Sequence, residues 1–336
     1  MCAFVRDVLH PREIGVILSY RCLSDCAHCL YNSGPNWRDW MDEDEVGAAL
    51  RTAKKVWGSG FQLHFTGGEP FLHFPLLRAS VQIAVDLDIP CYVETNASWC
   101  RDQQKVGDRF RQLREVGLDA VLISVSPFHQ ESIPLKHTLD AISIARSVFG
   151  DNRVIVYQSD WLPEMSRHGV DGPVPLDVYQ SEYGANQAGL HLWLGYGLIS
   201  GGRAGYRLGN LVPKRKAEAF HGVNCQAELL FAPHSHLDLY GNYIPGFCGG
   251  ITLGDWHDLE ALIEGYGEDR YPTLIRLLIE RGPFGLYQKA VGAYAYQPLP
   301  DGYAGKCHLC VDVRKHLLES HLFEETLKPH KFYESF

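Results

Sequence analysis

Three cysteines stand within one short stretch near the N-terminus, in "YRCLSDCAHCLYNSG", residues 20–34. Cys22, Cys26 and Cys29 have the spacing C-x3-C-x2-C, which lets one loop surround a single metal ion or cluster. A closed zinc site takes four ligands, and no fourth ligand lies at finger spacing unless His28 is recruited. Iron–sulfur clusters take one thiolate per iron, so three thiolates on a four-iron cluster leave one iron open. The stretch therefore predicts an iron–sulfur site with a free position for a substrate or cofactor.

A second stretch whose residues could bind a ligand is "HFTGGEPFL", which contains Gly67, Gly68, Glu69 and Pro70. It follows a short apolar run that predicts a strand. Two adjacent glycines let a backbone approach a ligand closely, and a carboxylate at that place can receive an ammonium group. Glycine and proline are common in all turns, so this stretch is informative only together with the cysteine loop.

The elements that must position these residues follow an alternating pattern in the first half of the chain. Short apolar runs alternate with longer helical patterns, which indicates βα units and a parallel sheet. In a parallel α/β barrel the functional residues gather at the carboxyl ends of the strands. The segment 159–188 contains Pro163, Pro173 and Pro175, and we expect it to be irregular. The predicted strands are Ile14–Leu18, Gln62–Phe65, Cys91–Glu94, Ala120–Val125, Val154–Tyr157 and a sixth near Leu190–Leu194; the predicted helices are 42–57, 75–87, 102–116 and 136–149.

The pattern changes from about residue 215. The stretch "HLDLYGNYIPGFC" predicts two strands around a Tyr-Gly-Asn turn, followed by helices near 256–265 and 271–281. We therefore expect an α/β barrel-like domain over residues 1–212 and a smaller α+β extension over residues 213–336.

Composition excludes several classes of function. The chain has 336 residues, a net charge of −9, and no run of Lys or Arg that would suit nucleic acid or an anionic membrane. No apolar stretch reaches the ~20 residues that span a bilayer, and the charged N-terminus does not resemble a signal peptide. Cysteines in close clusters within such a chain favour metal binding over disulfides. We expect a cytoplasmic protein with neither a nucleic-acid nor a membrane partner.

The cysteine loop after the first strand and Gly-Gly-Glu-Pro after the second together resemble radical S-adenosylmethionine (SAM) enzymes. The resemblance implies a partial (β/α)6 barrel in which Cys22, Cys26 and Cys29 hold a [4Fe–4S] cluster. The amino and carboxylate groups of SAM would bind the open iron, and Gly67, Gly68, Glu69 and Pro70 would hold the amino group. Reductive cleavage of SAM would give a 5′-deoxyadenosyl radical that abstracts a substrate hydrogen. The resemblance covers residues 14 to about 205.

Two further strand ends fit the same scheme. In "ETNASW" the family often has Thr-Asn-Gly, and Ala97 replaces the glycine; the resemblance makes Asn96 a cofactor-binding residue. In "ISVSPFHQE", Ser124 would meet the ribose or carboxylate of SAM. Asn96, Ser124 and His129 are equally explained as polar residues that cap strand ends. The stretch "SGGRAGYR", residues 200–207, is either a SAM-facing loop or a plain glycine-rich turn.

A second set of cysteines lies in the extension: Cys225, Cys248, Cys307 and Cys310. The C-x2-C pair of the last two alone fits a zinc knuckle, a cluster or a dithiol. With the other two it resembles the SPASM or shorter twitch extension of radical SAM enzymes, which implies an auxiliary [4Fe–4S] cluster. If only three thiolates bind, Cys225 is the candidate thiol that returns a hydrogen atom to a substrate radical. We expect Cys91 to be buried in a strand and Cys100 to lie in a surface loop.

Three functional hypotheses remain. The first, from resemblance to radical SAM peptide epimerases, is a peptide-modifying enzyme that epimerises or cross-links a ribosomally synthesised peptide. The second is a radical SAM dehydrogenase or mutase acting on a small metabolite such as an aminosugar. The third is a zinc-binding protein without catalysis. The first two hypotheses, both of a radical SAM enzyme, imply a flavodoxin or ferredoxin as electron donor. A set of aromatic residues would line a peptide groove or fill the core: Trp161, Tyr179, Tyr183, Trp193 and Tyr196.

Overall fold

The computed structural model describes residues 8–265, 271–334 and 336, and the chain divides into two compact units. We call Glu13–Cys26 with Ser33–Ala188 the sheet unit. We call the remainder, which includes Ala27–Asn32 and Gly189–Phe336, the C-terminal unit. The domain boundary expected after residue 212 stays a prediction.

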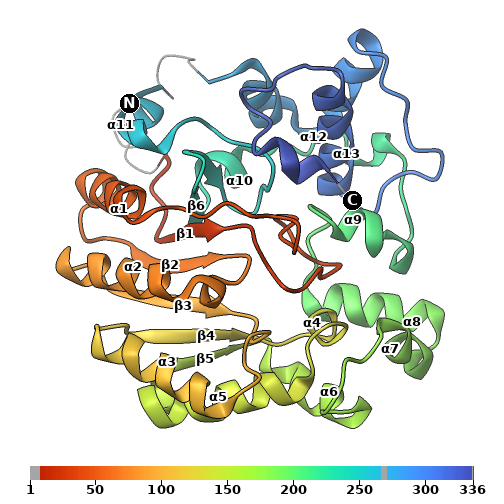
Figure 1. The fold of residues 1–336 in the computed structure, drawn as a ribbon. Helices are drawn as coiled ribbons and strands as arrows, with labels where there is room; N and C mark the ends of the chain where they lie inside the picture. The colour runs from red at the N-terminus through yellow and green to blue at the C-terminus, as the bar shows by residue number, and fades with distance from the viewer. Residues whose placement is uncertain (1–7, 266–270, 335) are drawn as a thin grey trace. The chain divides into compact units, whose positions relative to one another are not determined.

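The sheet unit is built on five parallel strands in the order β5-β4-β3-β2-β1 (Figure 1). The central strands β1, β2 and β3 are mostly buried, as in a parallel sheet covered on its faces, whereas Ile155 and Tyr157 of the edge strand β5 are exposed. Their carboxyl ends lie at one edge, so the segments that follow β1, β2 and β3 are neighbours. The strands are β1 (Glu13–Ser19), β2 (Gln62–Gly67), β3 (Cys91–Thr95), β4 (Ala120–Ser124) and β5 (Val154–Tyr157). The first five predicted strands are confirmed.

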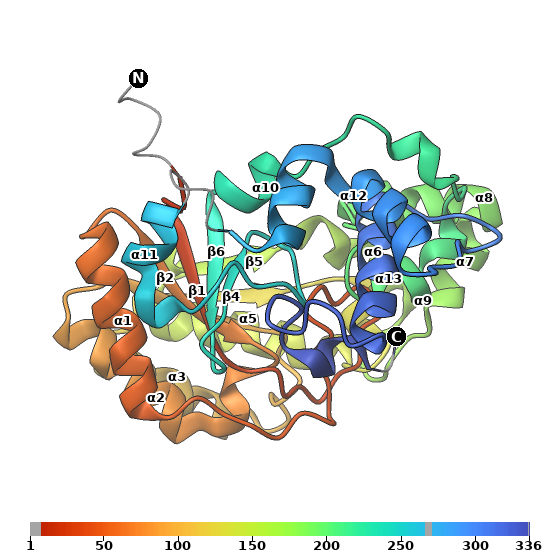
Figure 2. The same cartoon turned by 90° about the horizontal axis from the view of Figure 1, so that it is seen from above.

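Helices join consecutive strands and pack in a row along the sheet (Figures 1 and 2). The Asp42 carboxylate caps the first by accepting from the Glu45 N–H at 2.8 Å, and Asp102 caps the third in the same way. Such caps satisfy backbone donors that a helix start leaves free. The four helices are α1 (Glu43–Trp57), α2 (Phe74–Asp86), α3 (Gln103–Glu115) and α5 (Leu135–Phe149); a short α4 (Pro127–Gln130) precedes α5. The α/β prediction is confirmed.

Two expectations for residues 159–194 are wrong. The segment expected to be irregular forms helices, and Pro163 and Pro175 lie at the helix starts, where proline is well tolerated. The sixth strand predicted at Leu190–Leu194 is instead a π-helical stretch, His191–Gly195. An apolar run this short does not distinguish a strand from a helix. The helices of this region are α6 (Leu162–His168), α7 (Leu176–Tyr183) and α8 (Ala185–Leu190).

The C-terminal unit combines a hairpin with helices. The hairpin is confirmed: β6 (His234–Asp238) pairs antiparallel with β7 (Tyr243–Pro245) around the predicted turn. The helix predicted over 271–281 extends further, because α12 (Thr273–Ala293) continues beyond a break at Gly282. Gly282 has φ +62°, and a Cβ there would lie 1.8 Å from the Val223 carbonyl oxygen. The other helices are α9 (Ala204–Arg207), α10 (Gln226–Leu230), α11 (Leu259–Glu264) and α13 (Lys306–Glu319).

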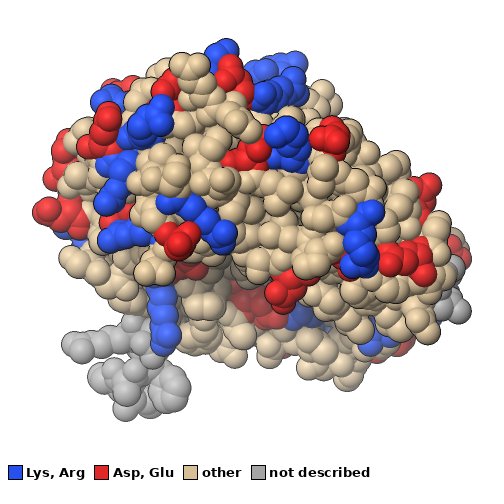
Figure 3. All heavy atoms as spheres, turned by 90° about the horizontal axis from the view of Figure 1, so that it is seen from below, with Lys and Arg blue, Asp and Glu red and all other residues tan. Residues whose placement is uncertain are grey.

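Charged residues of both signs are interspersed on the face drawn in Figure 3, where no large patch of one sign gathers. In the described part of the chain, no helix combines the length and the apolar character needed to cross a membrane.

Candidate functional site

The loop that carries Cys22 is closed by backbone hydrogen bonds at its base. The Cys22 N–H donates to the Gly34 carbonyl (3.1 Å), and the Gly34 N–H donates to the Tyr20 carbonyl (3.0 Å). Cys22 and Cys26 are both buried. The Ser24 N–H also donates to the Cys22 sulfur at 3.4 Å. The sequence "YRCLSDCAHCLYNSG" therefore leaves β1 and returns beside its own start, as a cluster-binding loop would have to do.

The Gly-Gly-Glu-Pro segment leaves β2 against the residues that enter this loop. The Gly68 N–H donates to the Ser19 carbonyl and the Glu69 N–H to the Arg21 carbonyl, both at 2.8 Å. A Cβ at Gly68 would lie 2.0 Å from the Arg21 carbonyl oxygen, and one at Gly67, with φ +130°, would lie 2.2 Å from the Ser19 carbonyl oxygen. The two glycines are thus required by the close approach of β2 to the end of β1.

Glu69 is buried and its carboxylate accepts from protein donors. The Thr95 hydroxyl lies 3.0 and 2.9 Å from its two oxygens, the Asn96 N–H lies 2.9 Å from Oε2, and the Phe71 N–H lies 3.2 Å from Oε1. Burial raises the pKa of Glu69 to about 7, although the hydrogen bonds from Asn96, Thr95 and Phe71 lower it. Pro70 begins a 3-10 turn that Glu69 caps. In this arrangement Glu69 joins the end of β2 to the end of β3.

Asn96 makes the most direct contact between a predicted cofactor residue and a predicted cluster ligand. Its Nδ2 lies 3.1 Å from the Cys22 sulfur, and both residues are buried. Its Oδ1 accepts from the Ser98 N–H at 2.9 Å. The next residue, Ala97, has φ +61° and is fully buried. The ends of β1, β2 and β3 therefore meet around Cys22 through one set of hydrogen bonds.

The residues after β4 have mostly capping roles. Ser124 is the last residue of β4, is half-buried and pairs with Tyr157 of β5. The Ser126 oxygen caps α4 by accepting from the His129 N–H at 3.2 Å, and its hydroxyl lies 2.7 Å from His129 Nδ1. Burial lowers the pKa of His129 to about 4. For Ser126 and His129 the capping interpretation accounts for the contacts; the cofactor role of Ser124 stays a prediction.

The third cysteine, Cys29, is half-buried and belongs to the C-terminal unit, where the glycine-rich stretch 200–207 packs against it. The Arg203 N–H donates to the Cys29 carbonyl at 3.1 Å. Gly202 has φ +54°, and a Cβ there would lie 2.3 Å from the same carbonyl oxygen. The Arg203 side chain is buried and donates to Asn32 Oδ1 at 3.1 Å. This stretch therefore fixes the backbone of the cysteine loop at Cys29.

The cysteines of the extension lie near one another, and the pKa values of three of their thiols are raised by burial and by neighbouring cysteines. Burial, followed by Cys310 and Cys248, raises the pKa of the Cys225 thiol. Burial, then Cys307, raises that of Cys248 to about 12, and burial, then Cys310, raises that of Cys307 to about 11. Two cations adjoin the set: Lys306, which is paired with Glu228, and Arg314, which is buried. Arg314 is held by the Gly249 carbonyl at 3.1 Å and the Tyr333 hydroxyl at 3.0 Å.

The spacing of these thiols bears on the zinc hypothesis. With Zn–S bonds of about 2.3 Å in a tetrahedron, the sulfur atoms of a zinc site lie about 3.8 Å apart. Among the described residues, no cysteine belongs to a group of three or more ligand atoms within 4.8 Å of one another. The thiols of the extension, all of them in the described part of the chain, are thus not gathered at the spacing of a closed zinc site.

Other cysteine and aromatic predictions have mixed outcomes. Cys91 is buried in β3 as predicted. Cys100 was expected at the surface, and this is wrong, because it is only 3% exposed although it belongs to the loop after β3. Of the five aromatic residues considered for a groove, three are buried in the core: Trp161, Tyr179 and Trp193.

Sequence reasoning missed a polar cluster on the strands themselves. His64 Nε2 lies 3.8 Å from Glu94 Oε1, the Thr66 hydroxyl donates to Glu94 Oε2 at 2.6 Å, and the Tyr92 hydroxyl donates to Glu13. Burial, and then the charge of Glu13, raise the pKa of Glu94 to about 7, although the Thr66 hydrogen bond lowers it. The signal was the alternation of polar residues along β2 and β3, which puts them on one face.

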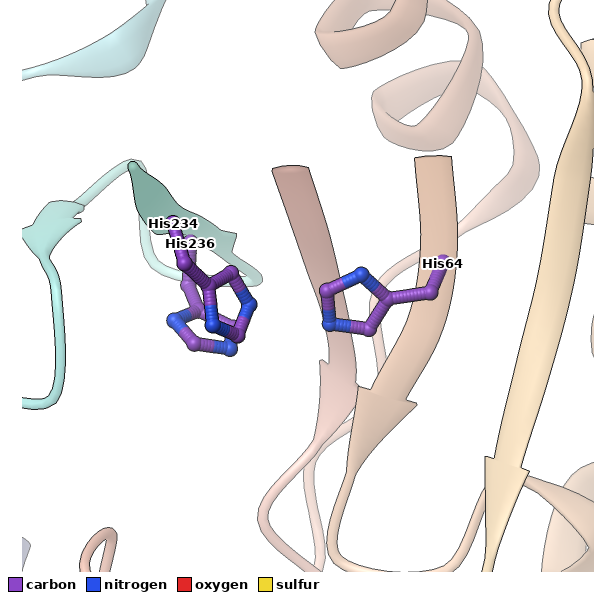
Figure 4. Close-up of side chains that lie close together, drawn as sticks. All are labelled: His64, His234 and His236. Carbon is purple, nitrogen blue, oxygen red and sulfur yellow. The ribbon is translucent and has the colours of Figure 1, made fainter. Parts of the chain in front are cut away.

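Figure 4 shows His64 extending from β2, and His234 and His236 extending from β6. Within the C-terminal unit the His234 and His236 rings lie 4.4 Å apart, and His236 Nδ1 lies 3.0 Å from the Tyr31 hydroxyl. This hydrogen bond ties the hairpin to the segment that follows Cys29.

Comparison with known proteins gives one family and one curated relative. Residues 16–157 match the description "Radical SAM superfamily". A protein of Bacillus subtilis (strain 168), YydG, named as a candidate peptide biosynthesis protein, is 24% identical over 122 residues. That alignment covers 36% of this chain, and the chain spans only 38% of the length of YydG.

Similar solved structures include BtrN in complex with AdoMet and 2-DOIA. It is 14% identical, with a TM-score of 0.43, and the match covers 81% of this chain and 89% of that one. Native anSMEcpe with bound AdoMet and Cp18Cys peptide is 10% identical, with a TM-score of 0.45 and coverage of 91% and 95%. The family match spans β1 to β5 and includes the cysteine loop, the Gly-Gly-Glu-Pro segment and Asn96. Residues 16–157 of this chain are thus similar to the radical SAM superfamily.

Proposed function

We propose that the chain is a radical SAM enzyme in which Cys22, Cys26 and Cys29 hold a [4Fe–4S] cluster. The observation that carries the proposal is the set of hydrogen bonds joining the ends of β1, β2 and β3 around Cys22. These residues fit a [4Fe–4S] cluster, because cysteine thiolates are its usual ligands and the loop offers three of them. SAM would take the open iron beside Gly67, Gly68, Glu69 and Pro70, with Asn96 and Ser124 as further cofactor-side residues.

The work of the protein's own residues in this scheme is positioning and exclusion. The cluster with SAM would supply a radical that abstracts a substrate hydrogen. The backbone bonds of Gly68 and Glu69 hold the end of β2 against the cysteine loop, and burial of Cys22 and Cys26 keeps water from the sulfur atoms. Fixed geometry of this kind lowers the entropic cost of bringing the reacting groups together.

The second cysteine set would hold an auxiliary [4Fe–4S] cluster through Cys225, Cys248, Cys307 and Cys310. A cluster with four thiolates carries net negative charge, and Lys306 and Arg314 adjoin the set to offset it. We assign Cys225 as a ligand, because it is buried and lies near Cys248 and Cys310. A free Cys225 that returns a hydrogen atom to the substrate is the competing assignment. On this proposal residues 1–212 form the radical SAM domain and residues 213–336 the auxiliary-cluster domain.

The proposed substrate is a ribosomally synthesised peptide that is epimerised or cross-linked. The likeness to YydG, named for peptide biosynthesis, supports this choice over a small metabolite. A flavodoxin or ferredoxin in the cytoplasm would supply the electron.

The test uses the full chain, reconstituted anaerobically and incubated with SAM, reductant and a short peptide encoded beside its gene. Mass spectrometry in D2O distinguishes the outcomes. Epimerisation adds one deuterium at a single residue, and a cross-link removes two hydrogens. If the peptide remains unchanged while SAM is cleaved and an added aminosugar is dehydrogenated or rearranged, the metabolite proposal would replace the peptide one. The Cys22→Ala variant is the control and should leave the peptide unchanged.

A further inference from the structure

The amide of Asn96 is placed to act on the Cys22 sulfur. The N···S distance of 3.1 Å is short for a hydrogen bond to sulfur, and both partners are buried. Cys22 also receives the Ser24 N–H at 3.4 Å, so its sulfur has at least two donors from the protein. Donors to sulfur are among the features that set the reduction potential of an iron–sulfur cluster.

The orientation of the Asn96 amide is determined by its surroundings. The oxygen and nitrogen of an amide are told apart by their hydrogen-bond partners. Oδ1 accepts from the Ser98 N–H at 2.9 Å, which is a donor only, so Nδ2 must be the atom that faces Cys22. The Asn96 main chain is fixed as well, because its N–H donates to Glu69 Oε2 at 2.9 Å.

The loop around Asn96 is held in an unfavourable conformation. Ala97 has φ +61°, in the left-handed region that residues with a Cβ rarely adopt. The Thr95 hydroxyl oxygen maintains it by accepting from the Ala97 N–H at 3.1 Å and from the Trp99 indole N–H at 3.0 Å. Strain of this kind persists where the surroundings over-determine it, and here the consequence is a fixed direction for the Asn96 side chain.

We infer that Asn96 is a positioning residue whose side-chain N–H raises the reduction potential of the cluster held by Cys22. This inference rests on the proposed function, because it requires a cluster at the cysteine loop. One-electron reduction makes the cluster more negative, and a hydrogen bond to a charged sulfur is stronger than one to a neutral group. The donor therefore stabilises the reduced cluster more than the oxidised one, and this eases reduction of the cluster by its electron donor.

The variants Asn96→Ala and Asn96→Asp separate this role from a structural one. Alanine removes the donor, whereas aspartate keeps the shape of asparagine but replaces the donor with a charged acceptor beside the sulfur. Asn152→Ala, at an exposed position of the sheet unit, is the matched control. The measurement is a redox titration of the reconstituted protein followed by electron paramagnetic resonance. The signal of this cluster is identified by its change on addition of SAM.

At a fixed potential we expect the ratio of reduced to oxidised cluster to fall at least about tenfold in Asn96→Ala, which is about 59 mV for one electron. It should fall further in Asn96→Asp and stay at the wild-type value in Asn152→Ala. A potential that is the same in all four proteins would overturn the inference while leaving the proposed function intact. Loss of the cluster from both Asn96 variants would also overturn it, since Asn96 would then serve assembly. A wild-type protein that binds no cluster at Cys22 would refute the proposed function itself.

Discussion

Replacing Gly68 by alanine tests the close approach between the end of β2 and the cysteine loop. The new Cβ would lie 2.0 Å from the Arg21 carbonyl oxygen, whereas Cβ atoms essentially never come within 3.0 Å of another atom. The two segments must therefore separate by about 1 Å. Overpacking of this kind costs ~1–3 kcal/mol, and weakening of the hydrogen bonds to Ser19 and Arg21 adds about 1 kcal/mol each. We expect Gly68→Ala to lower the free energy of unfolding by roughly 3–5 kcal/mol.

The assay is urea unfolding of the reconstituted protein, with iron counted on the folded fraction. Gly172→Ala is the control, because a Cβ at Gly172 would meet nothing within 4 Å. Its free energy of unfolding should stay within about 0.5 kcal/mol of wild type. Since displacement of Arg21 also moves Cys22, Gly68→Ala should lose iron as well as stability. If Gly68→Ala is as stable as Gly172→Ala and binds as much iron, the close approach described here is wrong.

Three further predictions address other parts of the chain. Tyr179→Phe should lower the free energy of unfolding in urea by ~1–3 kcal/mol, because the buried Tyr179 hydroxyl donates to Gln130. The control Tyr157→Phe, at an exposed position, should leave the free energy of unfolding almost unchanged. Equal losses in the two variants would contradict the reasoning. Burial raises the pKa of Glu94 from 4.5 to about 7, so its contribution to stability is present below pH 4.5 and is lost as pH rises through 7. Glu94→Gln should therefore be stabilising relative to wild type at pH 8, by an amount on the order of 3 kcal/mol, and not at pH 4.5; a pH-independent difference in urea midpoints would refute the assignment. Cys307→Ala should lower the iron content from about eight to about four atoms per chain while SAM still binds. An unchanged iron content would contradict the proposed auxiliary cluster.

The sequence predicted the sheet well because its strands are strongly patterned. β1 to β5 are short apolar runs separated by amphipathic helices, and each lies within a residue or two of the expected place. The sixth strand failed because Leu190–Leu194 is too short for its periodicity to be read. The helices α6 and α7 were missed because Pro163 and Pro175 were taken as helix breakers. Proline is in fact common at the start of a helix, where its missing N–H costs no hydrogen bond.

The candidate site was predicted as a set of residues but not as a set of contacts. The spacing of Cys22, Cys26 and Cys29 identified the loop, and Gly-Gly-Glu-Pro identified the neighbouring strand end. Glu69 was expected to receive an ammonium group, and that role stays a prediction; the sequence did not indicate that its oxygens accept from Thr95, Asn96 and Phe71. Contacts between strand ends join residues that are far apart in the sequence, and the local pattern of one segment does not show which distant residue it meets. For the same reason the hydrogen bond from Asn96 to Cys22 became visible only in the structure.

The most direct test of the central claim is SAM cleavage by the anaerobically reconstituted full chain. Wild-type protein and the variant in which Cys22, Cys26 and Cys29 are all alanine are reduced with dithionite, and 5′-deoxyadenosine and iron are measured together. The account predicts 5′-deoxyadenosine from wild type alone and a fall in iron from about eight to about four atoms per chain in the variant. Equal 5′-deoxyadenosine from both proteins, or bound zinc with no 5′-deoxyadenosine from either, would contradict it.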